Sequence, residues 1–398
     1  MRLLQVMALV FLPMATSAAR AADTVSPPSD HDFAASFLMR GGYDTNPQFS
    51  SGNGIGGSAF LGTETALIAG AKTGDTTLGI AAEAGTIDYA NPRATPTRRG
   101  KVILRGSFGT DELRLSSTTT LADIDSYNQR SRDISQALKL EARVGDVKLF
   151  ATAEGGRGSL NQTNAIFQDF LPRPQQFLRA SIVPGISLVR GKAELGVSVN
   201  VSTRRYVDEL DDFGFRRDNE RMQPFVFAKY DGDSVTAFGA ISRLYGKWHD
   251  VDFSDVDRLL FEANLTWRAK PFKIDFLASR RASETTFPIS PITIDTIYSA
   301  KASWTIDPQW TVLASLGYAD TEYLASPFRA RTLSYGVGVT RELDADLVWG
   351  LDLTRAQGTL ISGARADALI VMTSLTKKFG SPAKAARLPS SSQVAAAR

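Results

Sequence analysis

Cysteine is absent from the 398 residues, and histidine occurs only twice. The lack of cysteine fits a bacterial protein that is exported without disulfides. His31 falls in a polar N-terminal stretch and His249 in a predicted loop, so neither is placed to activate a serine nucleophile. The sequence also has no Gly-x-Ser-x-Gly elbow, phosphate-binding loop or zinc-ligand spacing. An enzyme is therefore the least favoured class of function, and no metal or cofactor is predicted.

The sequence also has no apolar run long enough to cross a bilayer as a helix. Its one extended apolar run, Leu3–Met14, follows Arg2 and precedes the small-residue site Ala19-Arg20-Ala21. This order predicts a signal peptide over residues 1–21, with a buried N-terminal helix as the alternative. Loss of that segment would leave 43 basic residues against 42 acidic ones. A near-neutral chain gives no reason to expect a nucleic-acid partner.

The remaining chain has no composition break, no long linker and no separate plug domain. We predict one domain from about Phe33 to Phe379. The preceding residues 22–32 form a polar lead, and residues 380–398 form a tail of Ser and Ala with basic residues and no acidic ones. Both ends are predicted to be disordered.

Eighteen stretches alternate apolar and polar residues at period two, and the connections between them are alternately long and short. The short connections carry Gly, Asp or Pro, which tight turns require. The pattern predicts an all-β, antiparallel transmembrane barrel of about 18 strands (16–18), with short periplasmic turns and long extracellular loops. The long connections are predicted at 44–57, 88–97, 122–132, 157–175, 204–219, 246–256, 281–292, 320–328 and 357–365.

The two faces of a predicted strand differ in chemistry. Along Leu259–Arg268, alternate residues from Leu259 to Trp267 are apolar, and most of those between them, such as Glu262 and Asn264, are polar. Such runs are about ten residues long, which suits a tilted membrane strand better than a soluble one. One face therefore suits lipid and the other suits water.

Aromatic residues gather near both ends of the predicted strands, as the interfaces of a membrane barrel require. The alternative is that aromatic residues merely favour strands. The girdle next to the short turns comprises Trp267, Phe272, Trp304, Trp310, Trp349 and Phe379, and the one near the long loops comprises Tyr43, Tyr89, Tyr206, Tyr245, Tyr318 and Tyr323.

The segment Arg40–Pro47, with Gly42-Tyr43-Asp44-Thr45-Asn46, resembles the Gly-Tyr-Asp-x-Asn opening of a bacterial family of outer-membrane β-barrel porins. The last strand, Asp367–Phe379, resembles the assembly signal of such barrels, although nineteen residues follow its terminal aromatic. The resemblance implies a bacterial outer-membrane location and a pore or an exopolysaccharide-associated barrel. Membrane lipid, lipopolysaccharide and the outer-membrane assembly machinery are the expected partners. No feature indicates the oligomeric state.

Three predicted hairpins bring basic residues together in the lumen. Two-residue turns would place Arg105 opposite Arg114, Arg143 opposite Lys148, and Arg268 opposite Lys273. Like charges directly opposite each other are destabilising, so nearby carboxylates or passing anions should offset them. Either an anion-attracting wall or basic chains extending into water would explain the pattern. The candidate carboxylates are Glu112, Glu141, Glu154, Glu262 and Asp275.

A barrel of 16–18 strands leaves an aqueous channel unless a loop narrows it. The longest connection, 157–175, and the next, 204–219, are the candidates. The first contains Asn161, Phe167, Asp169 and Phe170 as possible constriction residues. The acidic loop His249–Asp257 is predicted to be solvated rather than calcium-binding.

The predicted function is a porin-like channel for small hydrophilic solutes or an exported polysaccharide. The rival is a structural or adhesive barrel whose loops close the lumen.

Overall fold

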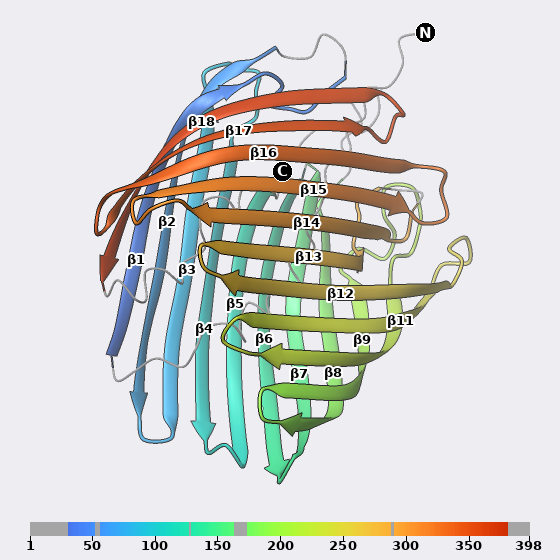
Figure 1. Cartoon of the computed structure of the whole chain (residues 1–398). Helices are drawn as coiled ribbons and strands as arrows, with labels where there is room; N and C mark the ends of the chain where they lie inside the picture. Colours follow the sequence, from blue (N-terminus) through green and yellow to red (C-terminus); the bar gives the residue numbers. More distant parts are fainter. Residues whose placement is uncertain (1–30, 52–55, 127–128, 163–172, 288–289, 381–398) are drawn as a thin grey trace.

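The computed structural model describes residues 31–51, 56–126, 129–162, 173–287 and 290–380. They form one antiparallel sheet of eighteen strands in chain order, and β1 closes it by pairing with both β2 and β18 (Figure 1). The predicted closed barrel of about eighteen strands is confirmed. The strands are β1 (His31–Asp44), β2 (Ser58–Thr73), β3 (Thr76–Tyr89), β4 (Thr97–Gly109), β5 (Leu113–Ser126), β6 (Gln129–Val144), β7 (Val147–Gln162), β8 (Gln175–Arg190), β9 (Ala193–Tyr206), β10 (Asn219–Asp231), β11 (Val235–Trp248), β12 (Val256–Ala269), β13 (Phe272–Ser283), β14 (Thr293–Thr305), β15 (Trp310–Tyr323), β16 (Arg329–Asp344), β17 (Leu347–Thr359) and β18 (Arg365–Gly380).

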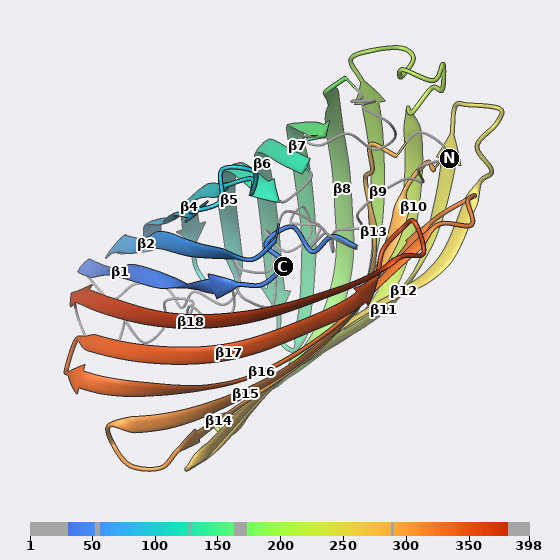
Figure 2. The same ribbon diagram turned by 90° about the horizontal axis from the view of Figure 1, so that it is seen from above.

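Seen from above, β1–β9 and β10–β18 form two walls that enclose the lumen, and the β1–β18 seam lies opposite the β9–β10 pair (Figure 2). Among the described residues there is no helix long and apolar enough to cross a membrane.

Tight turns and long loops alternate around the barrel as predicted, except at the connection between β5 and β6. Gly74, Gly145 and Gly191 adopt positive φ values of 56–59° in the tight turns, a conformation that glycine reaches without steric cost. One predicted long loop, 122–132, is wrong, because β5 continues to Ser126 and β6 begins at Gln129. Asp123 binds Arg130 across the two strands, with Nε–Oδ1 and Nη2–Oδ2 both at 2.6 Å, so side-chain ion pairs accompany the extended ladder.

The outer face of the barrel is apolar and the inner face is largely polar. On β12, Leu259 and Trp267 are 60% and 41% exposed, whereas Leu260 on the inner face is 4% exposed. Exposed Leu, Ile, Val and Phe side chains recur at alternate positions on the other strands. The predicted division into a lipid face and a water face is therefore confirmed.

Glycines on the inner face make room for large rings on neighbouring strands. Gly185 on β8 is the direct partner of Phe150 on β7, and a Cβ at Gly185 would lie 2.2 Å from the ring tip. Gly196 on β9 is related in the same way to Phe227 on β10, at 2.4 Å. Each ring thus fills the place of a missing side chain, and the two rings meet edge to face at 6.0 Å.

The predicted aromatic girdle beside the short turns has the expected strand positions, and Phe272 stacks on Trp304 with centroids 6.1 Å apart. The girdle predicted at the long-loop end is wrong for three tyrosines. Tyr89 packs on the buried Phe60 of the inner face, with ring centroids 6.1 Å apart. Tyr206 donates a hydrogen bond to Glu284, and Tyr323 is buried against Phe287, so both rings serve the loop packing.

Candidate functional site

The predicted lumen residues lie on the inner face, with corrections at one hairpin. Gly109 pairs with Arg114, so Arg105 stands opposite Thr118 rather than opposite Arg114. The turn is longer than two residues because Gly109, at φ 110°, stays in the ladder and the Thr110 hydroxyl accepts the backbone N–H groups of Glu112 and Leu113. Glu112 therefore lies in the turn and not on the lumen wall.

The other two basic pairs have the predicted register. Arg143 stands opposite Lys148 and Arg268 opposite Lys273. Carboxylates lie beside them. Lys148 Nζ is 3.9 Å from Glu141 and also pairs with Glu194, and Lys273 Nζ is 2.7 Å from Asp275. These carboxylates offset the repulsion of like charges, as the sequence argument required.

The remaining predicted lumen carboxylates are also paired. Glu154 Oε1 is 3.0 Å from Nη2 of Arg179, which donates to Asp133 as well at 2.8 Å. Glu262 Oε1 is 2.7 Å from Nη2 of Arg281. The inner wall is thus a network of ion pairs between neighbouring strands.

Of the predicted constriction residues, the structure describes only Asn161. Asn161 lies within β7, opposite Arg130, on the outer face of the wall. Phe167, Asp169 and Phe170 lie outside the described residues. The second candidate connection, 204–219, does contribute to the inward packing described below.

In the β13–β14 connection, the described residues 284–287 and 290–292 fold inward across the lumen. Thr286 Oγ1 lies 3.0 Å from Oε1 of Gln162 on β7, which is six strands away from β13 in the sheet. Thr285, Thr286 and Phe287 are buried, at 7%, 4% and 4% exposure. A loop that stayed at the rim above its own strands would not make these contacts, so this loop narrows the barrel.

The side chain of Arg217, in the β9–β10 loop, binds the backbone of the inward β13–β14 loop. Its guanidinium donates to the carbonyl oxygens of Thr285 (3.0 Å), Phe287 (2.9 Å) and Ser290 (3.3 Å). The same group pairs with Asp211 at 2.8 Å, and both side chains are almost fully buried. A planar guanidinium with five donors suits a site where several carbonyls converge.

Glu284 begins the inward loop and lies between two arginines of the wall. Nε of Arg204 on β9 and Nη2 of Arg221 on β10 each lie 2.7 Å from its Oε1, and the Tyr206 hydroxyl donates to Oε2 at 3.0 Å. Burial by itself raises the pKa of Glu284, but the two guanidinium groups outweigh it, so the pKa lies below the ordinary glutamate value. Glu284 is therefore a buried, charged carboxylate.

Apolar side chains cover the loops at this end of the barrel. One cluster joins Ile292 and Ile294 of the β14 entry to Trp248, Phe253 and Leu324 from other loops and strand ends. A second joins Phe287 to Tyr323, Ala330 and Ile361. Because these residues come from four different loops and the strands beside them, the long-loop end of β10–β18 is packed as a unit.

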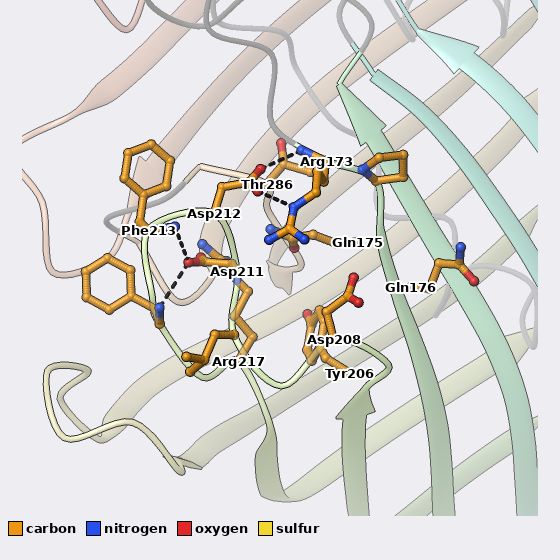
Figure 3. Close-up of a pocket in the computed structure, with 13 residues that line it drawn as sticks. Arg173, Gln175, Gln176, Tyr206, Asp208, Asp211, Asp212, Phe213, Arg217 and Thr286 are labelled. Atoms are coloured by element: carbon orange, nitrogen blue, oxygen red, sulfur yellow. Dashed lines mark hydrogen bonds and ion pairs between the residues drawn. The ribbon is translucent and has the colours of Figure 1, made fainter.

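A small pocket lies between the β9–β10 loop and the start of β8 (Figure 3). Tyr206, Arg217 and Thr286 line it together with Arg173, whose backbone N–H donates to Asp212 at 2.6 Å. Its volume of about 20 Å³ is close to that of one water probe. The pocket therefore marks a gap in the loop packing rather than a ready-made site for a large ligand.

The acidic loop 249–257 forms contacts within the loop region. Asp250 accepts the backbone N–H of Arg216 at 2.5 Å, and Asp257 pairs with Arg243 at 2.6 Å. Across the part of the chain that the structure describes, no group of three or more His, Asp or Glu residues is arranged to hold a metal ion.

Sequence reasoning missed the group Arg204, Arg217, Arg221 and Glu284. The available signal was composition: the segment 204–221 is rich in arginine, and Glu284 is the one acidic residue of the connection 281–292. That signal does not give the pairing, because Tyr206 and Glu284 are 78 residues apart in sequence.

The family match covers the part of the barrel that contains this loop cluster. Residues 189–379, from the end of β8 into β18, match the family described as "Putative beta-barrel porin 2". This segment is similar to that porin family. The resemblance inferred from the sequence is thereby confirmed, and the barrel is a protein of the bacterial outer membrane. No curated protein sequence matches the chain.

Solved outer-membrane barrels resemble this chain in fold. OccK2 (OpdF) of Pseudomonas aeruginosa is 8% identical with a TM-score of 0.48, over 88% of this chain and 98% of that one. OccAB3 of Acinetobacter baumannii is 10% identical with a TM-score of 0.45, over 88% and 100%. The FrpB iron transporter of Neisseria meningitidis is 8% identical with a TM-score of 0.44, over 90% and 84%.

Proposed function

We propose that the protein is a passive outer-membrane channel in which no bond is made or broken. The observation that carries this proposal is the lumen wall, where charged and hydrogen-bonding side chains line a barrel of eighteen strands. A barrel of this size leaves room for an aqueous path, and a wall of ion pairs suits water and small polar solutes. The long loops would face outside the cell and the short turns the periplasm.

Small hydrophilic solutes fit this proposal better than an exported polysaccharide. The β13–β14 loop reaches Gln162 on the other wall, and Arg217 and Glu284 tie it in place. A loop that crosses the lumen narrows the path, and a narrow path admits small molecules more readily than a polymer. We also propose a mild anion preference, carried by basic side chains on the inner face of the wall: Arg105, Arg114, Arg143 and Lys148.

A structural or adhesive barrel with a closed lumen is the second candidate. The apolar clusters over the long-loop end of β10–β18 favour it, because they pack several loops together. A liposome-swelling assay separates the two functions. Proteoliposomes should swell in a monosaccharide or small amino acid solution and should swell less in a long oligosaccharide. Absence of swelling in every solute, with folded protein in the membrane, would favour the closed structural barrel.

A further inference from the structure

The contact between Glu284 and the two wall arginines leaves unused binding capacity. Arg204 and Arg221 both approach the same oxygen, Oε1, while Oε2 receives the Tyr206 hydroxyl. We propose that Arg204 and Arg221 form a binding site for a solute anion with several oxygens, a carboxylate or a phosphate, and that Glu284 occupies this site until the solute replaces it. This inference rests on the proposed channel function and names the chemistry of its solute.

The geometry favours an external anion over the built-in carboxylate. A guanidinium binds a carboxylate or phosphate best through two parallel N–H···O bonds. Here one oxygen is shared by two guanidinium groups, so neither arginine has a two-oxygen partner in Glu284. A mobile anion is not attached to a loop and can orient its oxygens toward each arginine separately.

The wall holds Arg221 in place independently of Glu284. Its Nε donates to Oδ1 of Asn219 at 2.8 Å, and its guanidinium lies 5.2 Å from the ring centroid of Trp248. Arg204 projects from β9 beside Asn219 of β10, within the strand ladder. Departure of the Glu284 side chain would therefore leave the cationic site formed and ready for another anion.

Charge explains why release and binding would be coupled. Arg221 and Glu284 are 6% and 11% exposed, so moving the carboxylate away would leave buried positive charge without a counterion. Such an uncompensated charge is strongly unfavourable. Replacement of one carboxylate by another anion keeps the charge balance, so the loop leaves the site when a solute anion takes it. Tyr206, which donates to Glu284, also lines the small pocket together with Arg217 and Thr286 (Figure 3).

The test measures anion binding by the folded full-length barrel in detergent, with succinate, phosphate and chloride at equal ionic strength. Thermal stability is the readout, because a ligand that binds only the folded state raises Tm. Succinate or phosphate should raise the Tm of the wild type where chloride does not. Glu284→Gln lacks the competing charge of the carboxylate. The succinate or phosphate concentration that gives half of the maximum rise in Tm should therefore be at least tenfold lower in this variant than in the wild type. Whichever of the two gives the larger effect identifies the oxyanion class.

Two variants control this experiment. Arg221→Gln in the Glu284→Gln background should remove the effect of succinate and phosphate. Glu262→Gln, which removes another lumen carboxylate paired with an arginine, should behave as the wild type. An equal response to all three anions, or an unchanged response in Glu284→Gln, would overturn the proposal. Because binding is read without conductance, a protein that binds succinate but shows no solute passage would refute the channel and leave this site standing.

Discussion

Replacement of Arg217 by alanine should release the β13–β14 loop from the lumen. Arg217 is 3% exposed and donates to three carbonyl oxygens of that loop, at 2.9–3.3 Å. Its partner Asp211 is 7% exposed, so the substitution also leaves a buried carboxylate without its cation. Both losses act on the closed arrangement of the loops and leave the strand ladder intact.

The size of the effect follows from these contacts. Removing one partner of a buried ion pair costs about 3–5 kcal/mol, and each hydrogen bond from a charged donor contributes about 1.5–3 kcal/mol on its own. The two estimates overlap, because one guanidinium makes all of the contacts. We therefore expect the closed loop to lose about 3–5 kcal/mol, which shifts its closed-to-open ratio by roughly 10²–10⁴-fold.

Limited digestion with a glutamate-specific protease measures this shift at the Glu284–Thr285 bond, because Glu284 is only 11% exposed in the closed loop. The folded wild-type barrel should resist cleavage after Glu284, and Arg217→Ala should be cut there, as mass spectrometry of the fragments would show. Arg217→Lys should be intermediate, since one ammonium group cannot reach all of the carbonyls. Arg243→Ala removes an exposed ion pair with Asp257 and should resist cleavage like the wild type. Equal resistance of Arg217→Ala and wild type would refute the assigned role of Arg217.

Three further predictions test the faces, the orientation and the wall charge. Ala263→Arg, on the lipid face of β12, should destabilise the barrel by about 2–4 kcal/mol in denaturant unfolding. Asn264→Arg, on the lumen face, should be tolerated, and equal damage at both sites would refute the face assignment. Ser50→Cys should react with an impermeant maleimide on intact cells and Asp146→Cys should not, whereas the opposite result would reverse the barrel in the membrane. A reversal potential in a salt gradient should show mild anion preference that weakens as salt screens the wall. Unchanged selectivity after replacement of four basic wall residues by Gln would refute this anion preference. The four residues are Arg105, Arg114, Arg143 and Lys148.

The fold was predictable because its determinants are local. Alternation at period two fixes which face of each strand meets lipid, and Gly145-Asp146 sets its hairpin register directly. Gly109-Thr110 looks similar in sequence but gives a longer turn, because Thr110 caps the following residues with its hydroxyl. The two turn residues alone therefore do not show whether the turn is short or longer.

The inward loop was not predictable by the same reasoning. Its position depends on Arg204, Arg217 and Arg221, which meet Glu284 and its neighbours only after the barrel has closed. The length of a connection does not show where it folds, and the expectation that Asn161 belongs to a constriction failed for this reason. Asn161 continues the alternation of β7 and lies on the outer face.

Single-channel conductance is the most direct test of the central claim that this barrel is a channel narrowed by the β13–β14 loop. The measurement compares the wild type in a planar bilayer with a variant in which residues 285–290 are replaced by two glycines. The account predicts discrete conductance steps for the wild type and larger steps for the variant. A folded wild-type barrel and a folded variant that both fail to conduct would contradict the channel, and steps of identical size would contradict the constriction.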